Sequence, residues 1–190
     1  MEKALRIKTP DKKYIDGLLR GSIGKPLIVL VHGLCGNMNE ALHFNAARYF
    51  EKAGFSSFRF GLYSWCKGNR KLHECTIQTH GQDIDTVVKY LRSKGAKKIF
   101  LVGHSYGFPS ILNADTSNIQ GIVSWDGSMI PHTFFNGLPR IKTPKGYLID
   151  EGYLTVVGDK MVQEAKTGSS LKWLKKITAP IKIITNNAKP

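Results

Sequence analysis

Residues 98–107, with the sequence KIFLVGHSYG, constrain the fold of this chain more than any other segment. Four apolar residues run into Gly103, and a segment with helix-forming character follows, so the spacing predicts a buried strand, a sharp turn and a helix. A serine at the tip of such a turn has a strained backbone, and glycines at positions 103 and 107 remove side chains that would clash there. The pattern therefore predicts that Ser105 projects from the carboxyl edge of a parallel sheet.

A second segment, residues 26–37, is another apolar strand that breaks into a glycine-containing loop at His32 and Gly33. Acyl transfer through a serine needs backbone N–H donors aimed at the oxyanion of the tetrahedral intermediate. We expect Leu34 and Tyr106 to supply these donors as an oxyanion hole. His32 is expected to shape the loop rather than to act as a catalytic base.

Together, the His32-Gly33 pair and the Gly103-His104-Ser105-Tyr106-Gly107 motif, about seventy residues apart, resemble the α/β-hydrolase superfamily. The resemblance extends from about Leu5 to Thr185 and is specific for the fold, much less so for the substrate. It implies an α/β protein with a mostly parallel sheet, helices on both faces and an esterase- or lipase-like serine on a nucleophile elbow. It implies no metal and no organic cofactor.

Composition narrows the class of protein further. A chain of 190 residues with 42% hydrophobic residues is one domain with a proper core. The three cysteines are odd in number and lack Cys-x-x-Cys spacing, which argues against a disulfide framework or zinc site, and Cys35 is expected to be a buried thiol. Without a long apolar run or a signal-like start, the expectation is a cytoplasmic protein with no membrane span. The net charge of +14 is scattered, so nucleic-acid binding is only the weaker alternative.

The remaining elements are expected in the order of the superfamily. Strands are expected at residues 5–8, 14–20, 27–31, 55–60, 120–125 and 179–185, and helices at 39–53, 77–93 and 106–114. Asn39 is expected to cap the first helix. Residues 128–174 are expected to form a small lid insertion with a hairpin at 147–156 and short helices at 159–166 and 169–176. The fold is thus a single domain over residues 1–190, with the last strand and helix missing.

Several side chains are assigned roles within this frame. Helix 77–93 carries His80, Asp83 and Asp85, for which a solvated face is expected rather than a metal site. Tyr63 and Trp65 have two alternative roles: they contact the substrate, or they pack under their loop. The expected candidates for an acyl or aromatic binding surface are Trp125, Phe134 and Phe135.

The catalytic base is the part that the sequence does not supply. In the superfamily the chain order is nucleophile, acid, base, and the base follows a final strand that this sequence lacks. We therefore expect that the catalytic histidine lies outside these residues, in a longer hydrolase. The alternative is a degenerate member of the superfamily that has lost its activity. His132 satisfies the chain order but must fold back over Ser105, whereas His104 is expected to point away. The remaining histidines, at positions 43, 73 and 80 (His43, His73 and His80), are expected on helix or loop surfaces.

The acid is assigned to Asp126, at the end of the strand that follows the serine motif. The alternative for Asp126 is a turn-forming pair with Gly127. The acid's more usual position is the turn after residues 181–185, where Lys189 stands in place of an aspartate.

The resemblance implies a serine hydrolase that cleaves carboxylic esters or thioesters of small molecules through a Ser105 acyl-enzyme. The alternative is a non-catalytic protein of the same fold that binds an acyl or hydrophobic ligand or a protein partner. Because a sheet edge would be exposed without the last strand, the 190-residue chain alone is expected to be poorly soluble or inactive.

Overall fold

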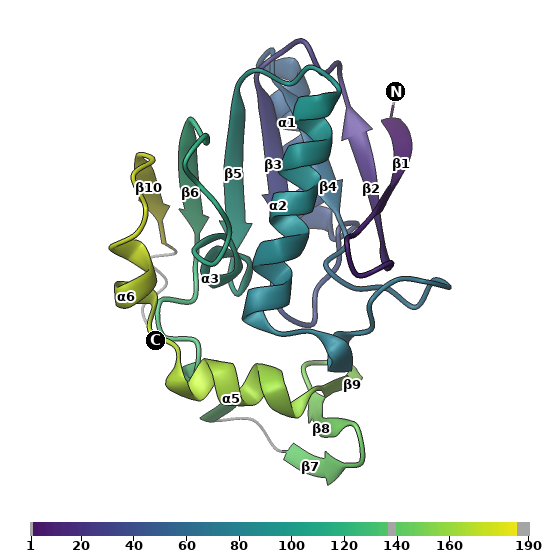
Figure 1. Cartoon of the computed structure of the whole chain (residues 1–190), viewed down its shortest axis with the longest axis vertical. Coiled ribbons are helices and arrows are strands. Elements are labelled where there is room, and N and C mark those ends of the chain that lie inside the picture. Colours follow the sequence, from purple (N-terminus) through teal and green to yellow (C-terminus); the bar gives the residue numbers. More distant parts are fainter. Residues whose placement is uncertain (1, 137–139, 186–190) are drawn as a thin grey trace.

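The computed structural model describes residues 2–136 and 140–185 and is built around a seven-stranded sheet (Figure 1). Its strands are β1 (Glu2–Lys8), β2 (Tyr14–Arg20), β3 (Leu27–Val31), β4 (Ser56–Phe60), β5 (Ile99–His104), β6 (Gly121–Trp125) and β10 (Ile181–Ile184). They lie in the order β1-β2-β4-β3-β5-β6-β10. The five strands from β4 to β10 are parallel, and the β1–β2 hairpin adds an antiparallel edge, as expected.

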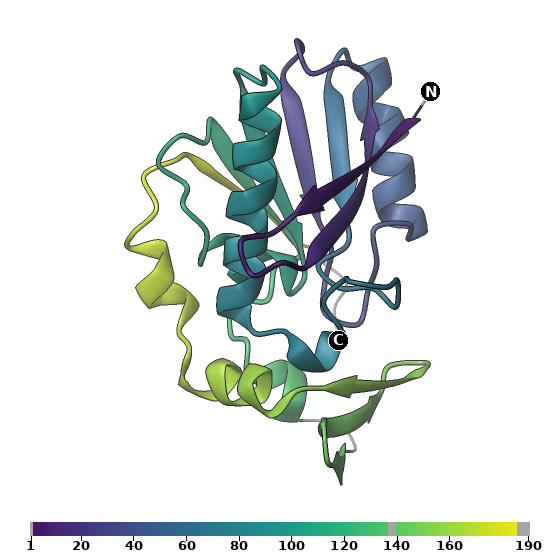
Figure 2. The same cartoon turned by 45° about the vertical axis from the view of Figure 1, so that its right-hand side comes forward.

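Helices cover both faces of the sheet (Figures 1 and 2). On one face lies α1 (Ala41–Lys52), and on the other lie α2 (Ile77–Ser93) and the short α3 (Gly107–Ile111). All five side chains of β3 are buried, because alternate residues face α1 on one side and α2 with α3 on the other. A strand covered on both faces reads as a continuous apolar run, which is why the sequence located β3 to the residue.

The N-termini of α2 and α1 are capped differently. The start of α2 is fixed by a capping box, in which the Thr76 hydroxyl accepts the Thr79 N–H and the Thr79 hydroxyl accepts the Thr76 N–H. The predicted Asn39 cap of α1 is wrong, because the N-cap residue is Glu40 and no side chain caps it. Asn39 instead donates its backbone N–H to the Asn37 side chain within the preceding turn.

The described residues between β6 and β10 include a separate layer at the carboxyl end of the large sheet. Their elements are α4 (Thr133–Asn136), β7 (Arg140–Thr143), β8 (Gly146–Asp150), β9 (Leu154–Val157), α5 (Asp159–Thr167) and α6 (Ser170–Leu174). Helix α5 and strands β7, β8 and β9 lie at the bottom of Figure 1, and α6 lies beside the sheet at the left. The predicted hairpin is present as β8 and β9. A small apolar core joins Met161 and Val162 of α5 to Ile77 of α2, so the layer is packed against the main domain.

The predicted solvated face of α2 is wrong for two residues. His80 and Asp83 are buried, because α3 and the loop before α2 cover that side of the helix. Arg70 from this loop donates two hydrogen bonds of 3.1 Å to the Asp83 carboxylate. His80 Nδ1 lies 3.2 Å from the Ser110 hydroxyl of α3. These side chains hold α2 against its neighbours.

Within residues 2–136 and 140–185, every helix is too short or too polar to cross a membrane.

Candidate active site

Ser105 follows β5 in a left-handed backbone conformation, with φ of +49°. This conformation costs an L-residue roughly 1–2 kcal/mol, so the surroundings must hold it in place. The Ser105 N–H donates to the Trp125 carbonyl at 3.1 Å, and the Ser105 carbonyl accepts the N–H groups of Phe108 and Ser128 at 3.2 and 3.0 Å. The turn predicted from the sequence is therefore present, with a half-buried serine at its tip.

The glycines of the motif are required by close backbone contacts. A Cβ atom at Gly103 would lie 2.7 Å from the backbone N of Phe108, and one at Gly107 would lie 2.3 Å from the Val31 carbonyl oxygen. Both distances are far below an ordinary van der Waals contact. The elbow is thus pressed against β3, which places Ser105 beside the loop that follows that strand.

The loop after β3 lies directly against the serine. A Cβ atom at Gly33 would be 3.1 Å from the Ser105 Cβ and 3.4 Å from its Oγ. Leu34 lines the same small cavity as Ser105. Within the described part of the chain, the backbone N–H groups of Leu34 and Tyr106 donate to no protein acceptor. These are the two amides that the sequence predicts as the oxyanion hole.

His32 has the structural role predicted for it. Its Nδ1 donates to the Gly33 carbonyl at 2.8 Å, and its Nε2 accepts the Leu62 N–H at 3.0 Å. Because Nε2 accepts a hydrogen bond, the ring is neutral, and burial lowers its pKa to about 4. With both nitrogens occupied, His32 fixes the loop and cannot take a proton from Ser105.

We expect this protein to lose stability steadily as the pH falls from about 6.5 to about 4. Burial lowers the pKa of His32 to about 4 and that of His80 to about 3, whereas both imidazoles bind protons near pH 6.5 once unfolded. The unfolded state then binds more protons, and the free energy of unfolding falls by about 1.4 kcal/mol per pH unit for each ring. Urea midpoints at pH 7.5, 6 and 5 measure this fall. A shallower fall is expected for His80→Phe, and equal wild-type midpoints would contradict the account.

The other histidines do not complete a triad. His132 precedes α4 and does not line the cavity at Ser105, whereas His104 does. The predicted surface position of His43 is wrong, because this side chain is 1% exposed under the end of β5. Among the described residues, no side chain hydrogen-bonds to the Ser105 Oγ.

Asp126 lies at the carboxyl end of β6, on the same edge of the sheet as Ser105. It is exposed, has φ of +48°, and donates its N–H to the Ile184 carbonyl at 2.7 Å. Gly127 is needed after it, because a Cβ there would lie 2.3 Å from the Ser124 Oγ. The residue is thus part of a tight turn, and its carboxylate has no hydrogen-bond partner within the described chain. Lys189 lies outside the described residues.

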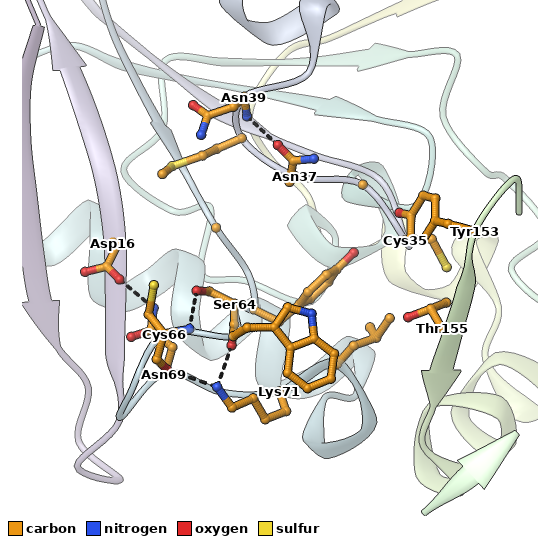
Figure 3. A pocket seen from close by; sticks show the side chains of 16 residues that line it. Asp16, Cys35, Asn37, Asn39, Ser64, Cys66, Asn69, Lys71, Tyr153 and Thr155 are labelled. Atoms are coloured by element: carbon orange, nitrogen blue, oxygen red, sulfur yellow. Dashed lines mark hydrogen bonds between the residues drawn. The ribbon is translucent and has the colours of Figure 1, made fainter. Parts of the chain in front are cut away.

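Two neighbouring cavities lie at this end of the sheet, and Ser105 lines one of them. The Ser105 pocket, of about 190 Å³, is lined by Gly33, Leu34, Cys35, Gly36, Glu40, His104, Ser105, Glu151 and Tyr153. A side pocket of about 460 Å³ lies between the loops after β3 and β4 and strand β9 (Figure 3). The two share Cys35, Gly36 and Tyr153 in their walls. Burial raises the pKa of the Cys35 thiol to about 12, so it is a neutral wall group, as predicted.

The lining differs from the one expected. Trp125 packs beside His104 and the α1 face of the sheet, and Phe135 is fully buried against Tyr106, so neither lines the two pockets. Phe134 is in the same aromatic group as Phe135 and is also absent from their walls. Trp65 lines the side pocket with 85% of its surface exposed, so it does not pack under its loop.

The contribution of the β8–β9 turn could not be found from the sequence. Glu151 and Tyr153 from this turn close the Ser105 pocket on the side away from the sheet. In Figure 3 Tyr153 lies beside Cys35, and both line the side pocket. The contact joins segments far apart in the chain, and a hairpin pattern carries no information on where its turn docks.

Lys71 is the cation of the side pocket. Its Nζ donates to the carbonyls of Ser64 and Cys66, both at 3.0 Å, and lies 5.6 Å from the centre of the Trp65 ring (Figure 3). These bonds close the loop 64–71 on itself. The loop is thereby preorganised as one wall of the pocket.

Comparison with known proteins supports the fold assignment. No protein-family model matches the sequence, and no curated protein matches it significantly. Solved structures do match. Est1E from Butyrivibrio proteoclasticus with bound ferulic acid is 21% identical, with a TM-score of 0.75 over 95% of this chain and 77% of that one. The Pyrococcus furiosus esterase Pf2001 is 16% identical, with a TM-score of 0.71 over 96% and 70%. Mouse alpha/beta hydrolase domain-containing protein 10 is 18% identical, with a TM-score of 0.67 over 98% and 90%.

The topology, the serine turn and these neighbours agree with one another. The chain has the α/β-hydrolase fold, as the sequence predicted. At these sequence identities, the similarity to solved structures shows the fold alone. Any inference about the reaction must come from the geometry at Ser105.

Proposed function

We propose that this protein is a serine hydrolase that cleaves carboxylic ester or thioester bonds through an acyl-enzyme on Ser105. The observation that carries the proposal is the strained Ser105 turn, because Ser105 lines a small cavity with Leu34, and the amides of Leu34 and of the adjacent Tyr106 have no acceptor among the described residues. A strained turn costs stability, and structures retain such strain mainly where a reaction or a ligand needs it.

The proposed reaction has two stages. Ser105 Oγ attacks the acyl carbon, and the two amides hold the negative oxygen of the tetrahedral intermediate. The bond to the leaving oxygen or sulfur then breaks, and the leaving group receives the serine proton through a general base. Water releases the acid from the acyl-enzyme in the second stage.

The base is proposed to be a histidine outside residues 1–190, because no described histidine reaches the Ser105 hydroxyl. We propose that Asp126 orients it, since this carboxylate is exposed at the same sheet edge and has no described partner. The turn-forming role of the Asp126-Gly127 pair is compatible with this, because only the backbone of Asp126 is engaged.

We propose that the larger half of the substrate occupies the side pocket. Tyr63, Trp65 and Tyr153 give this cavity aromatic walls, and it shares wall residues with the Ser105 pocket. Such walls suit an aromatic or apolar group. The Est1E structure with ferulic acid provides a precedent, in the same fold, for an aromatic carboxylic acid as ligand.

The alternative is a hydrolase-fold protein that binds such a ligand without cleaving it. It is favoured by the lack of any described base at Ser105. The two proposals differ in one property, the nucleophilicity of Ser105.

A fluorophosphonate probe on the full-length protein separates them. We expect one equivalent of label, located by mass spectrometry on the peptide that contains Ser105, because the probe phosphonylates only activated serines. The matched control is Ser117→Ala, which alters an exposed turn serine and should label like wild type. A folded wild-type protein that takes up no label would leave the binding protein as the function.

A further inference from the structure

Three side chains that bind metals meet beside the Ser105 pocket. Glu40 precedes α1, His43 is the third residue of that helix, and His104 is the last residue of β5. One carboxylate oxygen and one nitrogen from each ring all lie within 4.8 Å of one another. Because the strand and the helix are distant in the sequence, no local motif indicates this cluster.

The two histidines have polar atoms without partners. His43 is 1% exposed, and neither of its ring nitrogens makes a hydrogen bond within residues 2–136 and 140–185. His104 Nδ1 is buried and equally unsatisfied by any described residue. Buried polar atoms normally have partners, so three orphaned nitrogens in one place need an explanation. A cation bound between the rings would accept one lone pair from each of them, and so account for two of these nitrogens.

The carboxylate is already oriented toward the rings. Glu40 Oε1 accepts the Asn37 N–H at 3.1 Å, and Oε2 lies 3.4 Å from His43 Nδ1. A Cβ atom at Gly36 would be 2.5 Å from Oε1, so the loop needs glycine there for the carboxylate to fit. In a tetrahedral zinc site with bonds of about 2.1 Å, neighbouring ligand atoms are about 3.4 Å apart. The Glu40–His43 pair therefore has the spacing of two zinc ligands.

The surrounding charges permit a cation. Arg59 is a positive group near His43, but Glu2 accepts two hydrogen bonds from it, from Nη1 to Oε1 at 2.5 Å and from Nη2 to Oε2 at 2.9 Å. His32, the other nearby ring, is neutral because Nε2 accepts a hydrogen bond.

We propose that Glu40, His43 and His104 form a site for a divalent transition metal of the Zn²⁺ class. One carboxylate and two imidazoles are a typical zinc donor set, and three protein ligands leave a fourth position open. The site adjoins the Ser105 pocket, because Glu40 and His104 are in the walls of that pocket. The metal would link the loop after β3 to the end of β5. The proposal for this metal site does not depend on whether Ser105 is a nucleophile.

Zinc titration of the metal-stripped full-length protein tests the site. By calorimetry we expect one Zn²⁺ per chain with a micromolar or tighter Kd. Glu40→Gln and His104→Gln should each weaken binding at least about tenfold, whereas His73→Gln, at a half-buried histidine remote from the cluster, should not. All proteins carry Cys66→Ser, which removes the exposed thiol as a competing ligand. His43 is not altered, because its burial makes a folding defect expected.

A second readout does not depend on affinity alone. Zinc at one hundred times Kd should raise the wild-type melting temperature by about 5–10 °C and leave that of Glu40→Gln nearly unchanged. Co²⁺ bound in place of zinc should show the intense visible bands of a tetrahedral site. Failure of the wild type to bind zinc, or wild-type affinity in both ligand variants, would overturn the proposal.

Discussion

Replacement of Ser105 by alanine is expected to reduce hydrolysis of a p-nitrophenyl ester by at least about 10³-fold, with the fold unchanged. The hydroxyl is the proposed nucleophile, and its loss leaves only binding and the oxyanion amides to act on the substrate. Because the Ser105 Oγ makes no hydrogen bond within the described residues, its removal should change the free energy of unfolding by less than about 0.5 kcal/mol. Steady-state kinetics and urea denaturation on the full-length protein measure the two effects.

Glycine at the same position provides the matched comparison. Ser105→Gly should be as inactive as the alanine variant but slightly more stable than it, by up to about 1 kcal/mol, because glycine adopts a φ of +49° without strain. An active alanine variant would show that Ser105 is not the nucleophile. A glycine variant less stable than the alanine variant would contradict the inferred backbone strain at position 105.

The second large effect is expected for Gly107→Ala, which should lower the free energy of unfolding by about 3 kcal/mol. The added methyl group would lie 2.3 Å from the Val31 carbonyl oxygen and 2.9 Å from that of His32, and neither backbone group can rotate away. This cost exceeds the roughly 1 kcal/mol by which alanine improves on glycine within a helix. Any folded fraction should label at Ser105 about 10²-fold more slowly, because the elbow must move relative to the amides.

Gly24→Ala is the control for this substitution. Gly24 is exposed before β3, and its added Cβ would have no atom within 4 Å. It should therefore change stability by less than about 0.5 kcal/mol and leave labelling intact. Similar stability and labelling rates for the two variants would show that the elbow is not pressed against β3.

Much of the fold could be predicted because its determinants are local. The strand β3 is buried on both faces, so its apolar run needed no knowledge of its neighbours. The amphipathic period of α2 gave its bounds, Ile77–Ser93. The burial of His80 and Asp83 was missed, because it depends on Arg70 and Ser110 from other segments. A helical period identifies one buried face and cannot show that a second face is also covered.

In the candidate site, too, the local features could be predicted and the features that depend on distant segments could not. The glycine spacing, the serine turn and the structural role of His32 follow from one or two short segments. Phe135 was misassigned because an apolar side chain in an insertion suits a ligand surface and a small core equally well. The Tyr153 wall and the Glu40, His43 and His104 cluster arise only when separate elements pack together.

The account depends on Ser105 and two amides sharing one reaction point, and a crystal structure of the phosphonylated full-length protein tests this most directly. The account predicts phosphorus bonded to Ser105 Oγ and one phosphonyl oxygen about 2.7–3.1 Å from the backbone N of both Leu34 and Tyr106. An adduct on another residue, or an adduct whose oxygens all point away from these two amides, would contradict it.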